Sequence, residues 1–209
     1  MKGLLLKDLY MSKHYFKSYF FVVIIFLVVS ASGAENMFFS IYPSMLAGII
    51  SVSLCSYDEM SKWNLYSGTL PYSKRQMVTA KYLIGVFFQV IVLILAAVSQ
   101  IVRMNIEGSF SWNELGTLMS CLVIVSCISG ALCLPWVFKF GVEKGRLVYF
   151  IQIGIICGLG VFFMSYCQDV LSKTMRYNNI IAIATAVAVI VYAISWFVSV
   201  LFYEKREIQ

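Results

Sequence analysis

The sequence has very few ionisable residues outside a small number of short segments, and this scarcity limits what the protein can do. Charged residues make up 12% of the 209 positions, and His14 is the single histidine. A histidine-ligated zinc site and a Ser–His catalytic pair both require histidines that the long uncharged segments lack. The G-x-x-x-x-G-K-[ST] phosphate-binding loop is also missing, so any ATP that drives this protein must bind another chain. We therefore expect no catalytic residues, no metal site and no cofactor site in this chain.

Six uncharged segments are long enough to cross a membrane. A helix needs about 20 residues, at about 1.5 Å each, to cross a hydrocarbon core of roughly 30 Å. The six segments are residues 18–34, 37–57, 82–102, 115–138, 147–168 and 178–203. The sequence thus predicts an all-α, polytopic membrane protein with six transmembrane helices, forming a single transmembrane domain over residues 1–209.

Basic residues are concentrated on alternate connectors between these segments. Three of them, Arg103, Lys173 and Arg176, fall on one side of the predicted membrane. Thirteen fall on the other side: Lys2, Lys7, Lys13, Lys17, Lys62, Lys74, Arg75, Lys81, Lys139, Lys144, Arg146, Lys205 and Arg206. Short cytoplasmic loops carry the excess of Lys and Arg, so both termini are predicted to be cytoplasmic in a multi-pass protein of the cell membrane. Because these residues flank spans and no soluble domain accompanies them, we expect no nucleic-acid binding.

The predicted spans also contain no Asp, Glu, Lys, Arg or His, which argues against a proton- or ion-coupled carrier. Their polar residues include Gln89, Gln100 and Gln152, which either line a wet pathway or form hydrogen bonds between helices. All six cysteines lie in these segments without a metal-ligand spacing, and we interpret them as packing residues.

Residues 1–17 are predicted to form an amphipathic helix at the membrane interface, with its lysines facing anionic lipid. Ser73 with Gln76, and Ser111 with Glu114, match the capping-box pattern, so each pair is predicted to begin a helix.

The connector from Asp58 to Lys81 combines acidic and aromatic residues. Asp58 and Glu59 suit the first turn of a short helix, because carboxylates are favourable at a helix N-terminus. Trp63 and Tyr66 follow within the same predicted helix, which would end at a glycine. The two aromatics either anchor the connector among lipid headgroups or dock on a soluble partner.

A G-x-x-x-G motif, Gly154 to Gly158, lies in the fifth predicted span. This spacing allows close approach of helices, either within one chain or between subunits.

Three segments, residues 1–10, 58–66 and 70–83, resemble the type 2 ABC exporter permeases. In particular, they are similar to the short six-span permease subunits of antimicrobial-peptide and phenol-soluble-modulin exporters of Gram-positive bacteria. The resemblance implies a homodimer or heterodimer of six-span permeases on a dimer of ABC ATPase subunits, which bind ATP and Mg. It places a coupling helix at residues 58–67 and a dimer contact at Gly154 and Gly158. The residues expected to dock on the ATPase are Asp58, Glu59, Lys62, Trp63, Tyr66 and Ser67.

The sequence and the resemblance together predict a membrane permease subunit of an ATP-driven exporter, embedded in membrane lipid. Its expected cargo is apolar or amphipathic, with a peptide favoured, because the spans offer apolar walls without charges. The alternative is a non-transporting immunity or sensory subunit of the membrane that binds a peptide or a protein partner.

Overall fold

The structure is a computed structural model that describes residues 2–15, 17–32, 38–63, 66, 72–108, 110–145, 147–152, 154–155 and 177–205. The regular elements of these residues are helices. They are α1 (Lys2–Tyr15), α2 (Lys17–Ala31), α3 (Phe38–Met60), α5 (Lys74–Glu107), α6 (Trp112–Phe140) and α8 (Tyr177–Lys205). Residues 142–145, 147–152 and 154–155 are also helical.

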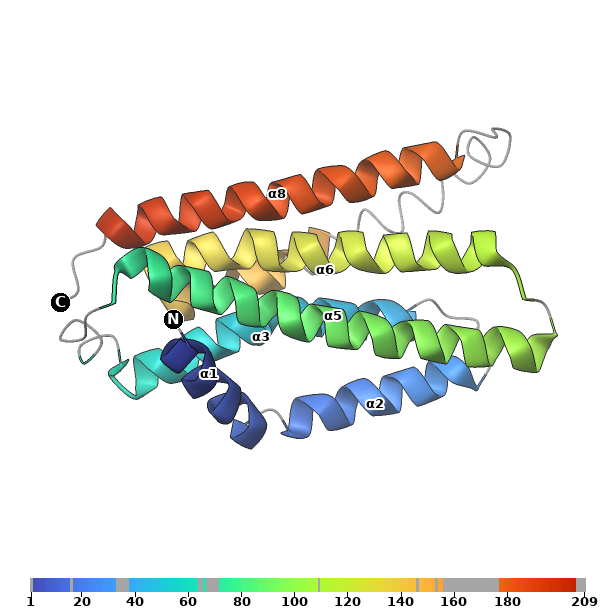
Figure 1. The fold of residues 1–209 in the computed structure, drawn as a ribbon, viewed down its shortest axis with the longest axis horizontal. Helices are drawn as coiled ribbons and strands as arrows, with labels where there is room; N and C mark the ends of the chain where they lie inside the picture. The colour runs from blue at the N-terminus through green and yellow to red at the C-terminus, as the bar shows by residue number, and fades with distance from the viewer. Residues whose placement is uncertain are drawn as a thin grey trace.

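The long helices lie lengthwise beside one another, and α1 crosses the bundle at one end (Figure 1). Among the described residues, α3, α5, α6 and Ile181–Lys205 of α8 are each long and apolar enough to cross a membrane. A fifth crossing results if α1 and α2, which meet at 66°, are counted as one bent span. The chain is therefore an all-α membrane protein with four to five candidate spans in its described part.

Two of the predicted spans account for the difference from six. Helix α2 contains 15 residues and covers about 22 Å, which is less than the roughly 30 Å hydrocarbon core. The predicted fifth span, residues 147–168, falls mostly outside the described residues. The six-span count therefore stays a prediction.

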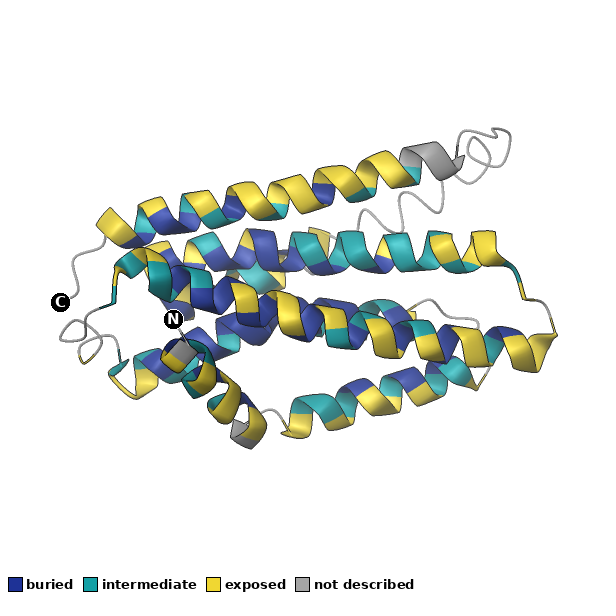
Figure 2. Ribbon diagram, viewed as in Figure 1, coloured by how far each residue is buried: buried dark blue, intermediate teal, exposed yellow. Residues whose placement is uncertain are grey.

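Helix α3 forms the centre of the bundle. Its most apolar stretch is 67% buried, compared with 11% for α8, which lies at the periphery (Figure 2). Small residues allow this central position, because a side chain at Gly48 would place its Cβ 2.8 Å from the Cβ of Ser129 on α6. On the other flank, Ser51 Oγ donates a hydrogen bond of 2.9 Å to the Lys81 carbonyl of α5.

Most basic residues of the described chain gather at one end of this bundle. The beginning of α1 and the end of α8 lie at the same end, which we call the α1 end (Figure 1). The C-terminal ends of α3 and α6 and the N-terminal end of α5 lie there too, with their lysines and arginines. At the opposite end, Arg103 Nη2 lies 3.7 Å from Glu114 Oε1. The described basic residues are thus separated by bundle end, as the connector pattern predicts.

The two predicted capping boxes differ in outcome. The box at α5 is confirmed. The backbone N–H of Gln76 donates to Ser73 Oγ, and the backbone N–H of Ser73 donates to Gln76 Oε1, both at 3.3 Å. At α6 the predicted helix start is confirmed, because Ser111 is the N-cap residue, but the capping box is not formed, since Ser111 makes no side-chain cap hydrogen bond. Its hydroxyl instead donates to Glu114 Oε2 at 3.1 Å, on the carboxylate that also faces Arg103.

Candidate functional site

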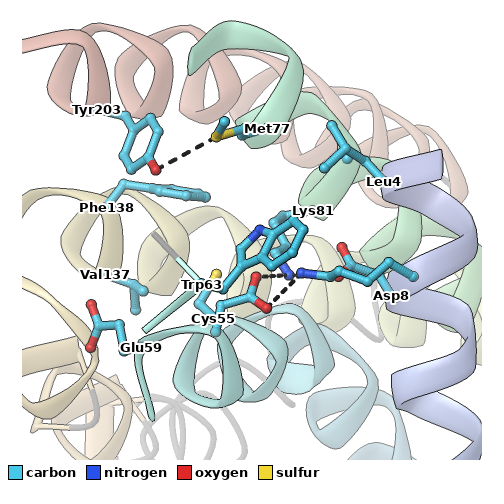
Figure 3. A pocket seen from close by; sticks show the side chains of 13 residues that line it. Leu4, Asp8, Cys55, Glu59, Trp63, Met77, Lys81, Val137, Phe138 and Tyr203 are labelled. Carbon is cyan, nitrogen blue, oxygen red and sulfur yellow. Dashed lines mark hydrogen bonds and ion pairs between the residues drawn. The ribbon is translucent and has the colours of Figure 1, made fainter. Parts of the chain in front are cut away.

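Four charged side chains from three helices meet at the α1 end of the bundle (Figure 3). Lys7 and Asp8 come from α1, Asp58 comes from the last turn of α3, and Lys81 comes from α5. The Asp58 carboxylate forms ion pairs with both lysines, with Lys7 Nζ 2.6 Å from Oδ1 and Lys81 Nζ 2.6 Å from Oδ2. Asp8 Oδ1 lies 3.0 Å from Lys81 Nζ and 3.2 Å from Lys7 Nζ. We call these four residues the ion-pair cluster.

The side chains of the ion-pair cluster are largely buried. The exposed fractions of the side chains are 2% for Asp8, 6% for Asp58, 9% for Lys81 and 23% for Lys7. Burying charges carries a desolvation cost that close opposite charges must offset, and here each lysine contacts both carboxylates. The formal charges sum to zero, so the cluster fastens α1 to α3 and α5 without leaving a net buried charge.

Trp63 connects this cluster to the surface. Lys7 Nζ lies 4.2 Å from the centroid of the Trp63 ring, which is within the range of a cation–π interaction. The Trp63 and Tyr66 rings are 5.5 Å apart, and Tyr66 is 59% exposed. A partner that contacts Tyr66 at the α1 end would therefore reach the buried charges through one aromatic side chain and Lys7.

A cavity beside the cluster is lined on its other side by apolar residues of α5, α6 and α8 (Figure 3). Met77, Phe138 and Tyr203 belong to this lining, and the Tyr203 hydroxyl donates to Met77 Sδ at 3.9 Å. The four residues of the ion-pair cluster also line this cavity, where they are paired with one another.

The structure places the predicted docking residues at different depths. Asp58 and Glu59 occupy the last turn of α3, and not the first turn of a separate helix. Helix α3 continues to Met60 because no glycine or proline interrupts it after Gly48. Asp58 is buried in the ion-pair cluster, whereas Glu59 Oε2 accepts a hydrogen bond of 3.1 Å from the Val142 amide.

Beyond α3 the chain turns sharply. Lys62 has φ 54°, a left-handed conformation, and its side chain is exposed. Trp63 and Tyr66 follow this turn, and Ser67 lies outside the described residues.

Sequence reasoning missed Asp8 and Lys81 as members of the cluster, and it expected Lys7 to face lipid. A signal for Asp8 was available, because it is the single acidic residue in the basic segment 1–17. Lys81 directly precedes an uncharged segment, so it was interpreted only as a basic residue that indicates membrane topology. Lys7 turns toward the bundle because Asp58 lies within 2.6 Å of its ammonium group.

The two glycines of the predicted dimer contact are only partly covered by the structure. A Cβ added at Gly154 would meet no atom of the described residues within 4 Å, so close packing against this part of the chain does not require a glycine there. Gly48 differs, since an added Cβ there would collide with Ser129. Gly158 lies outside the described residues.

The buried glutamines connect helices within the bundle. Gln89 Nε2 donates to the Ser126 carbonyl at 3.2 Å, joining α5 to α6. Gln100 Nε2 donates to Ser30 Oγ at 3.1 Å and to Ser40 Oγ at 2.6 Å, joining α5 to α2 and α3. These contacts agree with the interpretation of the polar residues as hydrogen bonds between helices.

Residues 3–204 match the ABC-2 family transporter protein family, which covers nearly the whole chain. The comparisons with curated proteins and with solved structures give no match. The chain belongs to the ABC-2 family of transporter proteins. It is therefore the membrane component of an ABC-2 type transporter, a family of typically non-catalytic permeases that implies an ATPase partner. Membership favours transport over the immunity or sensory alternative.

Proposed function

We propose that this ABC-2 family chain is the permease subunit of an exporter driven by ATP that a separate ATPase dimer binds and hydrolyses. The observation that carries the proposal is the family match over residues 3–204, in a chain without a phosphate-binding loop of its own. The cargo is an apolar or amphipathic molecule, and a peptide is favoured by the resemblance to peptide and phenol-soluble-modulin exporters.

The segment from Asp58 to Ser67, which comprises the last turn of α3 and the residues after it, is proposed to dock on the ATPase. Its support is the exposure of large side chains beyond the core of α3, with Met60 78% exposed and Tyr66 59% exposed. Aromatic anchors account for much of the binding energy in many protein interfaces. Trp63 and Tyr66 are therefore the main anchors, and Glu59, Lys62 and Ser67 lie at the edge of the contact.

Asp58 takes a different role in this proposal because it is buried. Its carboxylate contacts Lys7, which in turn contacts the Trp63 ring. A displacement of Trp63 by the ATPase would shift Lys7 and so disturb the ion pairs that fasten α1 to α3 and α5. The ion-pair cluster is thus the proposed connection between the docking segment and the spans.

The α1 end faces the cytoplasm in this proposal, because it carries most of the basic residues and the ATPase resides there. Both ends of the described chain lie at the α1 end, which supports an even number of crossings and agrees with six (Figure 1). The absence of described atoms within 4 Å of a Cβ at Gly154 supports a contact with a second permease, identical or related, through Gly154 and Gly158.

The cargo proposal rests on the apolar surface of the spans. On α2, Phe21 is 66% exposed and Val28 is 61% exposed, and Phe26 stacks on Tyr42 of α3 at 4.8 Å. An aromatic and aliphatic wall suits the apolar face of an amphipathic helix, whose polar face would contact water or backbone groups.

Co-purification with the partner ATPase tests the docking proposal. The variant Trp63→Ala, Tyr66→Ala should insert normally and retain less than about a tenth of the ATPase, since losing hot-spot aromatics costs about 2 kcal/mol or more. The matched control is Phe110→Ala, Trp112→Ala, which removes a comparable aromatic pair, 4.9 Å apart, from the opposite end of the bundle. Equal ATPase recovery with both double variants would show that Trp63 and Tyr66 are only anchors at the membrane surface.

A further inference from the structure

We propose that the α1 end of helix α6 forms a binding site for an anionic phospholipid, independent of the ATPase and of the cargo. Two lysines share one aromatic ring there. Lys139 Nζ lies 4.8 Å and Lys144 Nζ 5.8 Å from the centroid of the Phe140 ring. Lys139 Nζ also lies 4.8 Å from the centroid of the Phe202 ring on α8. The site thus joins the ends of α6 and α8.

A second aromatic ring extends this platform along α6 toward the membrane. The Trp136 and Phe140 rings stack, with centroids 5.4 Å apart and an angle of 18° between their planes. Trp136 is 45% exposed and Phe140 is 43% exposed, although both belong to a helix long and apolar enough to span a membrane. Half-exposed aromatic rings at the end of a span lie at the level of the lipid headgroups. The ring surfaces suit the upper part of an acyl chain, and the two ammonium groups suit the phosphate above it.

Lys139 and Lys144 outweigh the neighbouring Glu143, so these three residues carry a net positive charge. None of the ion pairs formed in the described part of the chain involves Lys139, Lys144 or the neighbouring Glu143. The lysines of the ion-pair cluster contrast with this, since each contacts two carboxylates. The ring contacts place both ammonium groups beside Phe140 and leave their hydrogen-bond donors available for an anion.

Charge complementarity therefore selects a lipid with a net negative phosphate headgroup, such as phosphatidylglycerol, over a zwitterionic lipid. Each net positive charge near a membrane surface contributes roughly 1 kcal/mol to the attraction of anionic lipid. Because Glu143 offsets one of the two lysines, the site keeps one net positive charge, which corresponds to about a five-fold preference. The overall positive charge of the chain attracts anionic lipid around the whole protein. The proposed site therefore predicts that anionic lipid is more enriched beside Trp136 than elsewhere around the protein.

Local lipid composition can be read from the fluorescence of Trp136. The full chain, with Trp63→Phe, Trp112→Phe and Trp196→Phe, is reconstituted in phosphatidylcholine nanodiscs that contain increasing fractions of brominated phosphatidylglycerol. A second series contains brominated phosphatidylcholine instead. Quenching of Trp136 gives the relative binding constant of the two lipids. We expect a preference of about five-fold for the anionic lipid.

Three lysine variants identify the source of the preference. The variant Lys139→Gln, Lys144→Gln should lower the preference to the background that bulk surface charge supplies, and Lys139→Arg, Lys144→Arg should retain it, because the charge is kept. The control Lys13→Gln, Lys17→Gln removes two exposed lysines elsewhere and should leave the preference near five-fold.

Three results would overturn the lipid site. They are equal quenching of the parent protein by the two lipids, an equal loss of preference in the Lys13 and Lys17 control, and no quenching by either lipid. The last result would mean that a second protein chain covers Trp136.

Discussion

Replacing Asp58 with asparagine removes one carboxylate from the ion-pair cluster and nearly preserves its shape. Lys7 and Lys81 would then share Asp8, leaving one unbalanced positive charge among side chains that are 2–23% exposed. Removing one partner of a buried ion pair costs about 3–5 kcal/mol. Asp58 makes the two shortest contacts of the cluster, both 2.6 Å. We therefore expect Asp58→Asn to reduce the free energy of unfolding by an amount in the upper part of that range.

The free energy of unfolding is measured by denaturant titration in lipid–detergent micelles, with helical circular dichroism as the signal. Glu107→Gln is the control, because Glu107 lies 3.6 Å from Arg103 but is 40% exposed. An exposed ion pair contributes about 0–1 kcal/mol, so this control should change little. The double variant Asp58→Asn, Lys81→Met restores a net charge of zero and should lose less stability than Asp58→Asn alone.

Two results would refute this reasoning. A loss for Asp58→Asn no larger than that for Glu107→Gln would mean that water reaches the cluster and screens its charges. The second result compares the double variant with its two single variants. If its loss of stability equals the sum of the losses for Asp58→Asn and Lys81→Met, the two residues do not interact.

Three further predictions concern assembly, packing and topology. Gly154→Leu should lower the yield of cross-linked permease dimer. The control Gly116→Leu, at a glycine of α6 where an added Cβ also meets no described atom within 4 Å, should not lower it. Equal dimer yields for the two variants would place the dimer contact elsewhere. Tyr82→Phe removes the hydrogen bonds between the Tyr82 hydroxyl and α8, including one of 2.7 Å with Ser199 Oγ, and should cost about 0.5–1.5 kcal/mol in the same unfolding titration. No change in stability would contradict that contact. A cysteine at Asn64 should react with a membrane-impermeant reagent only after cells are permeabilised, and labelling of intact cells would reverse the proposed orientation.

The helices were largely predictable because lipid requires long uncharged segments, and these segments are visible without any knowledge of tertiary contacts. Residues 82–102 lie within α5 and residues 115–138 lie within α6, and in both cases the structure extends the helix at each end. The hydrogen bonds at the helix ends were less predictable because they depend on partners. Ser111 is the N-cap of α6 as predicted, but its hydroxyl bonds to a carboxylate that also faces Arg103 of the preceding helix.

The candidate site was harder to predict for the same reason. Asp58 carries an ordinary signal for a helix N-terminus, and nothing local in the sequence shows that α3 extends past it. Its role becomes visible only when α1 brings Lys7 and Asp8 across the bundle to meet Lys81, contacts between residues 51 to 73 positions apart. Trp63 was recognised as an aromatic of the connector, but its contact with Lys7 required the three-dimensional arrangement.

ATP-dependent transport by the reconstituted complex tests the central proposal most directly. Inside-out vesicles containing this chain and its partner ATPase are supplied with ATP and a fluorescently labelled amphipathic peptide, and peptide accumulation inside the vesicles is measured over time. We predict accumulation that requires ATP, the ATPase and this chain together, and that is strongly reduced by Trp63→Ala, Tyr66→Ala but not by Phe110→Ala, Trp112→Ala. Peptide accumulation at the same rate in vesicles that contain the ATPase without this chain would contradict the account.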